Sequence, residues 1–298
     1  MNSNDLNTTS NDPEYPIFLG SEIDQGLPEE SFFHIIPVPF ERSVSYGGNT
    51  ALGPSSIMHA SWQLEVWEGK SKPTELGIHS TKVVDCSVDA DQVMKNIANQ
   101  VKQSLDVHAM PVVIGGEHSV TYGVIKGYLD AGFTDFGVVQ IDAHADLRDA
   151  YEGDPLSHAS AMKRIVDLDI PLYQLGIRAF CEEEIQTRID YNVHHRDADD
   201  IVANNIQEIT LPEDFPKKVF FTVDIDGIDP SIFPSTGTPV PGGLSWYQTL
   251  NLFESVAKQR EIIGFDLMEF APIVGFHAYD FAAAQLLYKF MGIVQRNR

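Results

Sequence analysis

Aspartate and histidine side chains occur at every second position where one apolar run of the sequence ends. The stretch VVQIDAHADLR places Asp142, His144 and Asp146 directly after that run. In an extended chain alternate side chains point to the same side, so these three side chains can converge on one point. Carboxylates and imidazoles gathered at the end of a buried strand repel one another and lose hydration unless a cation is present. The spacing therefore predicts a metal site rather than a polar loop.

Two further segments supply more potential ligands. The run FFTVDIDGIDP delivers Asp224 and Asp226 with the same spacing, and PVVIGGEHS delivers Glu117 and His118 after two glycines that permit a sharp turn. Open α/β sheets bind ligands at the carboxyl ends of their strands, so we expect the three segments to share one site. The candidate metal ligands are His118, Asp142, His144, Asp146, Asp224 and Asp226.

This set of donors is hard and too large for a single tetrahedral zinc ion. Two imidazoles and four carboxylates, without a thiolate, suit two divalent ions of the manganese type, and cobalt or nickel would fit similar ligands. Four carboxylates balance two dications, and a water held between two metals becomes hydroxide near neutral pH. The chemistry that these residues imply is metal-assisted hydrolysis.

The elements that must position these residues alternate along the chain. Apolar runs predict strands at 33–38, 82–86, 111–114, 136–141, 172–175, 219–223 and 262–265, and helical spacing predicts helices at 89–105, 119–129, 158–166, 245–258 and about 279–294. Most of the apolar runs are uniform rather than alternating, which is typical of strands buried on both faces of a parallel sheet. The alternation predicts an α/β fold, a three-layer α-β-α arrangement with a mostly parallel central sheet of about eight strands.

The composition limits the partners and the location. The chain has 298 residues and a net charge of −23, which makes nucleic acid and anionic membrane lipid poor partners and favours cationic ligands. No apolar run reaches the roughly 20 residues of a membrane helix, and the first residues lack a signal-peptide pattern, so we expect a non-exported, cytoplasmic protein. We expect residues 1–15 to form a disordered tail, residues 16–298 one catalytic domain, and Cys86 and Cys181 no disulfide.

Six sequence blocks follow one another along the chain: GGEHS, DAHADLR, SHAS, TVDIDGIDP, GTPVPGG and DLMEFAP. In this order and spacing they resemble the ureohydrolases, the family of arginase, agmatinase and relatives, and the resemblance covers nearly the whole chain after the first residues. It implies an arginase-like fold with two manganese ions per subunit. The implied reaction is hydrolysis of a guanidino compound to urea and an amine by a metal-bridging hydroxide. Members are commonly trimers or hexamers, so the resemblance also implies a homo-oligomer.

The resemblance also assigns roles to single residues. It divides the six ligands between the two ions, with His118 and Asp146 on one, His144 and Asp226 on the other, and Asp142 and Asp224 bridging both. Asp146 would carry a proton towards the leaving amine, with His158 of SHAS as a proton shuttle, and Glu269 of MEFAP would pair with the guanidinium. These roles make physical sense, because the amine leaves only when protonated and a carboxylate binds a planar guanidinium bidentately.

The run DLRDAYEGDPLSHAS bears on the substrate, because it is similar to agmatinases and implies hydrolysis of agmatine to putrescine and urea. Asp149, Glu152 or Asp154 would attract the second cation of agmatine, unless they are solvated loop charges. Arg148 is a structural residue or, if it points into the pocket, a partner for the carboxylate of guanidinobutyrate. Guanidine and arginine remain further alternatives. Two other hypotheses are a zinc-dependent deacetylase, which needs one metal, and an inactive relative.

Overall fold

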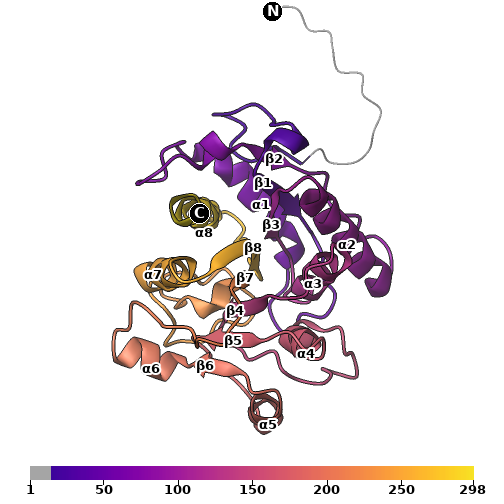
Figure 1. Cartoon of the computed structure of the whole chain (residues 1–298), viewed down its shortest axis with the longest axis vertical. Coiled ribbons are helices and arrows are strands. Elements are labelled where there is room, and N and C mark those ends of the chain that lie inside the picture. Colours follow the sequence, from indigo (N-terminus) through magenta and orange to yellow (C-terminus); the bar gives the residue numbers. More distant parts are fainter. Residues whose placement is uncertain (1–14) are drawn as a thin grey trace, which may run out of the picture.

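Eight parallel strands form one sheet in the computed structural model of the chain, which describes residues 15–298 (Figure 1). In chain order these strands are β1 (Phe33–Pro37), β2 (Ile78–Ser80), β3 (Met110–Ile114), β4 (Gly137–Ile141), β5 (Leu172–Leu175), β6 (His194–Arg196), β7 (Lys218–Asp224) and β8 (Glu261–Met268). Their order across the sheet is β2-β1-β3-β8-β7-β4-β5-β6, and all seven neighbouring pairs are parallel. The predicted sheet is therefore confirmed. The predicted tail lies, apart from Tyr15, outside the described residues.

Helices cover both faces of this sheet. The helices of the described chain are α1 (Gly53–Ala60), α2 (Ala90–Asp106), α3 (Val120–Asp130), α4 (Ala161–Val166), α5 (Glu182–Asp190), α6 (Ala198–Ala203), α7 (Trp246–Ala257) and α8 (Ala278–Asn297). Figure 1 shows α2, α3 and α4 on one side of the strands and α7 and α8 on the other, and α1 packs against α8. This arrangement is the predicted three-layer α-β-α fold.

The core lies between the sheet and these two helical layers. Strand residues such as Val112 and Val113 are fully buried on opposite faces, which explains why the strands have no polar alternation. On the α7 and α8 side, the rings of Phe253 and Phe290 stack with their centroids 4.2 Å apart, and Phe265 meets both edge-on. This aromatic cluster anchors the two helices to β7 and β8.

Two helix starts follow from capping residues in the sequence. The Asp89 side chain accepts a hydrogen bond from the Gln92 amide at 3.1 Å, and α2 begins after it. Ser245 and Gln248 form a reciprocal capping box that begins α7, with bonds of 3.2 and 3.0 Å. Each of these side chains satisfies a helix-end amide that would otherwise have no partner. The predicted starts of both helices are confirmed.

The predicted strand at 82–86 is wrong. The second strand is β2, which ends before this segment and follows a turn at Gly77, where φ is +78°. The segment continues beside β1. The Thr81 amide just before it donates to the Ile35 carbonyl, and within it the Val84 amide donates to the Pro37 carbonyl. An apolar segment beside an edge strand can be buried without a full hydrogen-bond ladder, and the sequence pattern does not distinguish the two cases.

The topology places four central strands side by side with their carboxyl ends at one edge. These strands are β3, β8, β7 and β4, and the predicted ligands follow or end three of them while Glu269 follows the fourth. Gly116, which follows β3, is required there because a Cβ would lie 2.0 Å from the Phe40 carbonyl oxygen. No helix within residues 15–298 is long and apolar enough to cross a membrane.

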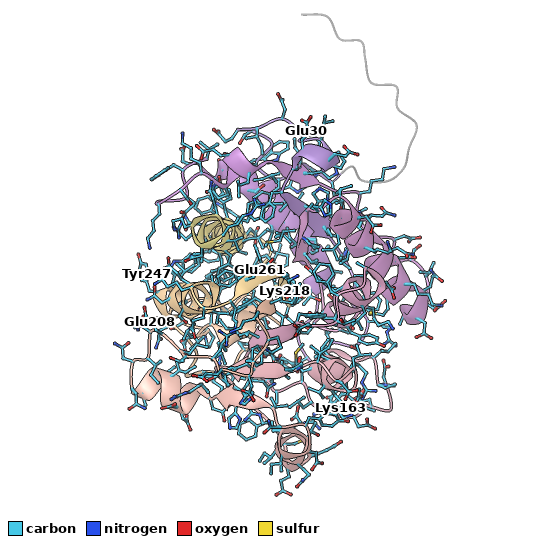
Figure 2. The ribbon with its side chains drawn as sticks, in the orientation of Figure 1. Glu30, Lys163, Glu208, Lys218, Tyr247 and Glu261 are labelled. Carbon is cyan, nitrogen blue, oxygen red and sulfur yellow. The ribbon has the colours of Figure 1, made fainter. Side chains whose placement is uncertain are left out.

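We predict that Phe253→Ala lowers the free energy of unfolding by about 3–5 kcal/mol, because it removes a fully buried ring and leaves a cavity. Urea unfolding followed by circular dichroism measures the change. Tyr247→Ala is the matched control on the same helix, since Tyr247 is 71% exposed and points outward (Figure 2). Equal unfolding midpoints for the two variants would contradict the assigned core.

Candidate metal centre

The six predicted ligands meet at the carboxyl edge of the four central strands. One ligand atom from each of His118, Asp142 and Asp146 lies within 4.8 Å of the others, and the same holds for Asp142, His144 and Asp226. Asp142 belongs to both groups. The sixth residue, Asp224, brings its Oδ2 to 3.3 Å from His118 Nδ1. The two groups therefore share a carboxylate, as two neighbouring cation positions would require.

A contact of its Nε2 with a threonine hydroxyl fixes the orientation of the His118 ring. Its Nε2 lies 2.9 Å from Thr222 Oγ1, and the tautomer with hydrogen on Nε2 satisfies this contact. Its Nδ1 then faces carboxylate oxygens of Asp142, Asp146 and Asp224 at 3.0, 3.1 and 3.3 Å, although the angle to none of them is that of a hydrogen bond. A buried ring nitrogen that faces three carboxylates without a hydrogen bond to any of them fits a divalent cation, which would take the place of a proton on that nitrogen.

The carboxylates are held in place by their own neighbours. Asp142 accepts hydrogen bonds from Gln140 Nε2 at 2.7 Å and from the His144 amide at 2.6 Å. Asp226 accepts one from the Ala143 amide at 3.0 Å, and its other oxygen lies 2.9 Å from His144 Nδ1. Because each group is oriented before any ligand enters, the site is preorganised for a cation.

Two residues of the site adopt strained backbone conformations. Asp146 has a φ of 54° and Glu269 a φ of 59°, both in the left-handed region that non-glycine residues rarely occupy. Such a conformation costs on the order of 1–3 kcal/mol and persists where the surrounding structure enforces it. At these positions it turns the side chains back towards the cavity above the ligand cluster, since both residues line that cavity.

The electrostatics of the cluster follow from its burial. Burial alone would lower the pKa of His144, but the facing carboxylates of Asp142 and Asp226 outweigh it and raise that pKa to about 12. Burial lowers and the surrounding carboxylates raise the pKa of His118, which ends well above its ordinary value. Burial together with the charge of Asp142 raises the pKa of Asp146 to about 7. Without a metal, the cluster therefore retains protons at neutral pH.

His158 lies beside the cluster on a short turn, His158–Ser160. Its amide donates to Ser43 Oγ at 2.9 Å, and its Nδ1 lies 3.3 Å from the same oxygen. Ser43 in turn donates to Glu117, which also accepts the amides of Arg42 and Ser43. Burial is the main cause of the lowered pKa of His158, so the ring is neutral near pH 7 and can accept a proton.

A cavity of about 250 Å³ opens above the cluster. Glu269 lines it and accepts the His118 amide at 2.8 Å, and burial followed by the charge of Glu117 raises the pKa of this carboxyl well above its ordinary value. The same cavity is also lined by Arg148, Tyr151 and Phe180. The cavity therefore offers a carboxylate near the cluster and aromatic and cationic side chains elsewhere.

The acidic residues after the metal motif do not line this cavity. Asp149 pairs with Arg164 at 3.0 Å, and Asp154 pairs with Arg42 at 2.5 Å, while Glu152 is exposed. The predicted alternative of loop charges therefore describes them better than a site for a cationic tail. Arg148 points into the cavity instead, with its guanidinium carbon 5.6 Å from the centroid of the Tyr151 ring.

Several residues that orient the site had no signal as a motif. Arg178 donates to the carbonyls of Asp226, Gly227 and Val240 at 2.5–3.3 Å and so ties the end of β7 to the GTPVPGG loop. Asp266 is buried in β8 and accepts from Thr121 at 2.9 Å, next to Thr222. A buried charge inside an apolar strand is the one sequence signal that marks Asp266.

The sequence matches the profile described as "Arginase family" over residues 32–292. It is 36% identical over 267 residues to the N(1)-aminopropylagmatine ureohydrolase of Synechocystis, with 87% of each chain covered. It is 30% identical to the agmatinase of Pyrococcus horikoshii, with 94% of this chain and 99% of the relative covered. The crystal structure of agmatine ureohydrolase of Thermoplasma volcanium superposes with a TM-score of 0.81 at 28% identity, covering 93% of this chain and 94% of that one.

We predict that binding of a divalent metal at pH 7 releases at least about one proton per chain. The raised pKa values of His118 and His144 keep these imidazoles protonated until the metal displaces their protons. Metal affinity should therefore fall as the pH falls. Titration calorimetry of the metal-free protein with Mn²⁺, in buffers of different ionisation enthalpy, gives the number of protons released.

His144→Asn should reduce this number by about one. His59→Asn is the control, because His59 is exposed on α1. An apparent binding enthalpy that is the same in every buffer would contradict the protonated state of the metal-free cluster.

Proposed function

The chain belongs to the arginase family of ureohydrolases, and we propose that it hydrolyses agmatine to putrescine and urea with two manganese ions. The observation that carries the proposal is the meeting of two imidazoles and four carboxylates below a 250 Å³ cavity that Glu269 also lines. The names of two relatives, an agmatinase and an N(1)-aminopropylagmatine ureohydrolase, support a guanidino substrate with an amine tail. The family match also argues against the zinc-dependent deacetylase considered from the sequence.

We assign the six ligands to two ions that share Asp142 and Asp224. His118 and Asp146 would complete one ion, and His144 and Asp226 the other, with cobalt or nickel as possible replacements for manganese. Divalent ions in these positions would lower the pKa of a coordinated water and supply a hydroxide nucleophile near neutral pH. Four carboxylates would balance the four positive charges.

The protein's own residues bind the guanidinium and move protons. Glu269 is a carboxylate buried next to the cluster, so a planar guanidinium cation placed there would restore its charged form and be held by charge-assisted hydrogen bonds. The departing amine must be protonated before the C–N bond breaks. The carboxylate of Asp146 lines the cavity, so it would hand on that proton, and the neutral ring of His158 would shuttle it to solvent.

The remaining cavity walls suit an amine tail in part. The rings of Tyr151 and Phe180 line the cavity, and an ammonium group lying over such a ring is stabilised by about 0.5–2 kcal/mol. The tyrosine ring also contacts His158, with centroids 5.8 Å apart, so a substrate tail on this wall would lie beside the proposed shuttle. The family resemblance alone supports our further proposal of a trimer or hexamer, and the cytoplasmic location expected from the sequence stays a proposal.

A second candidate substrate is 4-guanidinobutyrate, and the position of Arg148 favours it. Arg148 lines the cavity half-buried, and no carboxylate of residues 15–298 lies within salt-bridge distance of its guanidinium. An arginine in that setting is a natural partner for a substrate carboxylate. Two further candidate substrates are guanidine, which lacks a tail, and arginine, whose tail carries both an ammonium and a carboxylate group.

We expect the manganese-loaded protein to release urea from agmatine with a higher kcat/KM than from 4-guanidinobutyrate, guanidine or arginine. N(1)-aminopropylagmatine belongs in the same panel, because it extends agmatine at the amine end. A colorimetric urea assay with each substrate measures this order, and the metal-free protein is the control. Release of urea from none of these compounds would refute the proposal.

Arg148→Gln should separate the two substrate candidates. Removing a positive charge from the cavity should raise kcat/KM for agmatine and lower it for 4-guanidinobutyrate, each by about 5–30-fold, as expected for about 1–2 kcal/mol of charge interaction. Arg164→Gln is the matched control, because Arg164 pairs with Asp149 outside the cavity. If Arg148→Gln changes kcat/KM for either substrate no more than Arg164→Gln does, Arg148 does not select the substrate tail.

A further inference from the structure

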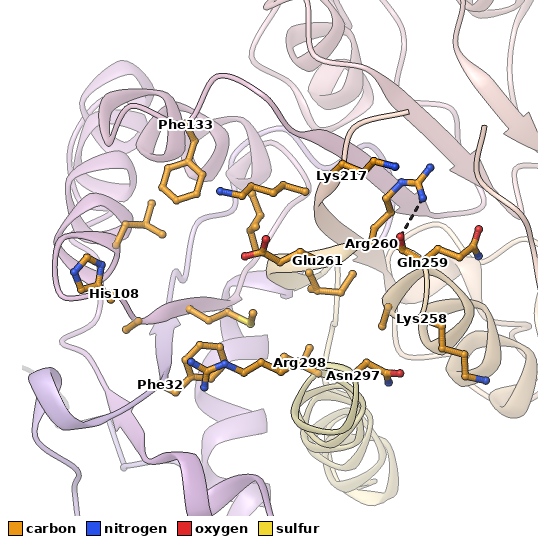
Figure 3. Close-up of a pocket in the computed structure, with 18 residues that line it drawn as sticks. Phe32, His108, Phe133, Lys217, Lys258, Gln259, Arg260, Glu261, Asn297 and Arg298 are labelled. Atoms are coloured by element: carbon orange, nitrogen blue, oxygen red, sulfur yellow. Dashed lines mark hydrogen bonds between the residues drawn. The ribbon is translucent and has the colours of Figure 1, made fainter. Parts of the chain in front are cut away.

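A second and larger hollow, of about 740 Å³, lies at the opposite edge of the sheet (Figure 3). Its walls come from the first residues of β3, β7 and β8 and from the carboxyl-terminal ends of α7 and α8. The same three strands lead at their other ends to His118, Asp224 and Glu269. The hollow is therefore separated from the metal centre by the length of the sheet, and its occupant would not block the substrate cavity.

The charge of this hollow is opposite to that of the whole protein. One quarter of the chain's 20 lysines and arginines line it, together with only one of its 43 acidic residues, Glu261. The basic residues are Lys217, Lys218, Lys258, Arg260 and Arg298. Within residues 15–298, Lys258 alone among them has a carboxylate within 4.0 Å, that of Glu208 at 3.8 Å. Unpaired cations that share a hollow in a protein of net charge −23 create a local site for an anion.

Aromatic and apolar side chains form the other part of the lining. The Lys218 ammonium lies 5.3 Å from the centroid of Phe133, and the Arg298 guanidinium lies 4.0 Å from that of Phe32. Figure 3 shows Phe133 near the top of the hollow and Phe32 near its bottom, with His108 and Glu261 at intermediate height. Because these cations lie over rings rather than against carboxylates, they remain available to an anion that also has an apolar body.

Helix ends explain some of these cations but not all of them. Lys258 and Arg298 follow the last residues of α7 and α8, where the partial negative charge of a helix end favours a cation. Arg260 donates to the Pro212 carbonyl and so holds a loop. Lys217 and Lys218 precede a strand, and no helix end or described carboxylate accounts for their position.

We propose that this hollow binds a small amphiphilic anion, in which a phosphate or carboxylate is attached to a planar or apolar body. The anionic group would lie near Lys218 and Lys217, and the body against Phe133 and neighbouring apolar residues such as Leu105. The volume lies within the range of about 300–1,000 Å³ that small-molecule sites have. A lone inorganic ion would leave the apolar part of the lining without a contact.

Three probes test both halves of this chemistry on the metal-loaded full chain. Adenosine 5′-monophosphate carries a ring and an anion, adenosine carries the ring alone, and inorganic phosphate carries the anion alone. By titration calorimetry we expect the monophosphate to bind at least about tenfold more tightly than either half, because both parts of the lining contribute. No binding of the monophosphate at up to 10 mM, or binding no tighter than that of phosphate, would overturn the proposal.

Charge reversal separates this hollow from the metal centre, where a phosphate can also bind. Lys218→Glu should weaken monophosphate binding by at least about tenfold, while Lys82→Glu, the same change at an exposed residue that does not line the hollow, should leave it unchanged. Equal affinities of the two variants would place the anion elsewhere and overturn the proposal. If Lys218→Glu lowers the Tm, Lys217→Glu serves in its place, since Lys217 is exposed.

Discussion

Mutual repulsion among buried carboxylates is the constraint on which the rest of this structure depends. Asp142, Asp146, Asp224 and Asp226 lie together almost without solvent, and only a cation or bound protons can offset their charge. A parallel sheet serves this purpose, because it brings the ends of non-consecutive strands to one edge while its hydrophobic faces supply the stability. The order β3-β8-β7-β4 brings His118, the four aspartates and Glu269 together at that edge.

Hydrogen bonds from neighbouring residues hold the ligands in place against this repulsion. Thr222, Gln140 and the amides of residues 143 and 144 each contact one ligand, and Arg178 donates hydrogen bonds to the carbonyls of Asp226 and Gly227 at the margin of the cluster. The left-handed conformations of Asp146 and Glu269 belong to the same arrangement. The stability of the core therefore supports strained conformations where they serve binding and proton transfer.

Period-two spacing after an apolar run predicted the ligand cluster because strand geometry is regular enough to be projected from sequence. The same logic recovered the sheet and the main helices, and it failed where geometry is not periodic. The edge segment 82–86 is not a strand, although its apolar residues predicted one. For the acidic residues 149, 152 and 154 the sequence left two alternatives open, and the structure places Asp149 and Asp154 in ion pairs outside the cavity and leaves Glu152 exposed. Which way a loop side chain points depends on long-range partners such as Arg42 and Arg164, and local sequence carries no record of them.

The loop between the metal motif and His158 is fastened at both ends. Asp149 forms an ion pair with Arg164, and Asp154 forms one with Arg42. Between them, two reciprocal backbone hydrogen bonds join Tyr151 and Asp154 and close the turn. Only Arg148 and Tyr151 of this loop reach the cavity, and neither contributes to the metal cluster. With the function proposed above, exchange of Arg148 would alter the part of the cavity that meets the substrate tail while every metal ligand stays in place, whereas exchange of Tyr151 would also remove a contact of His158.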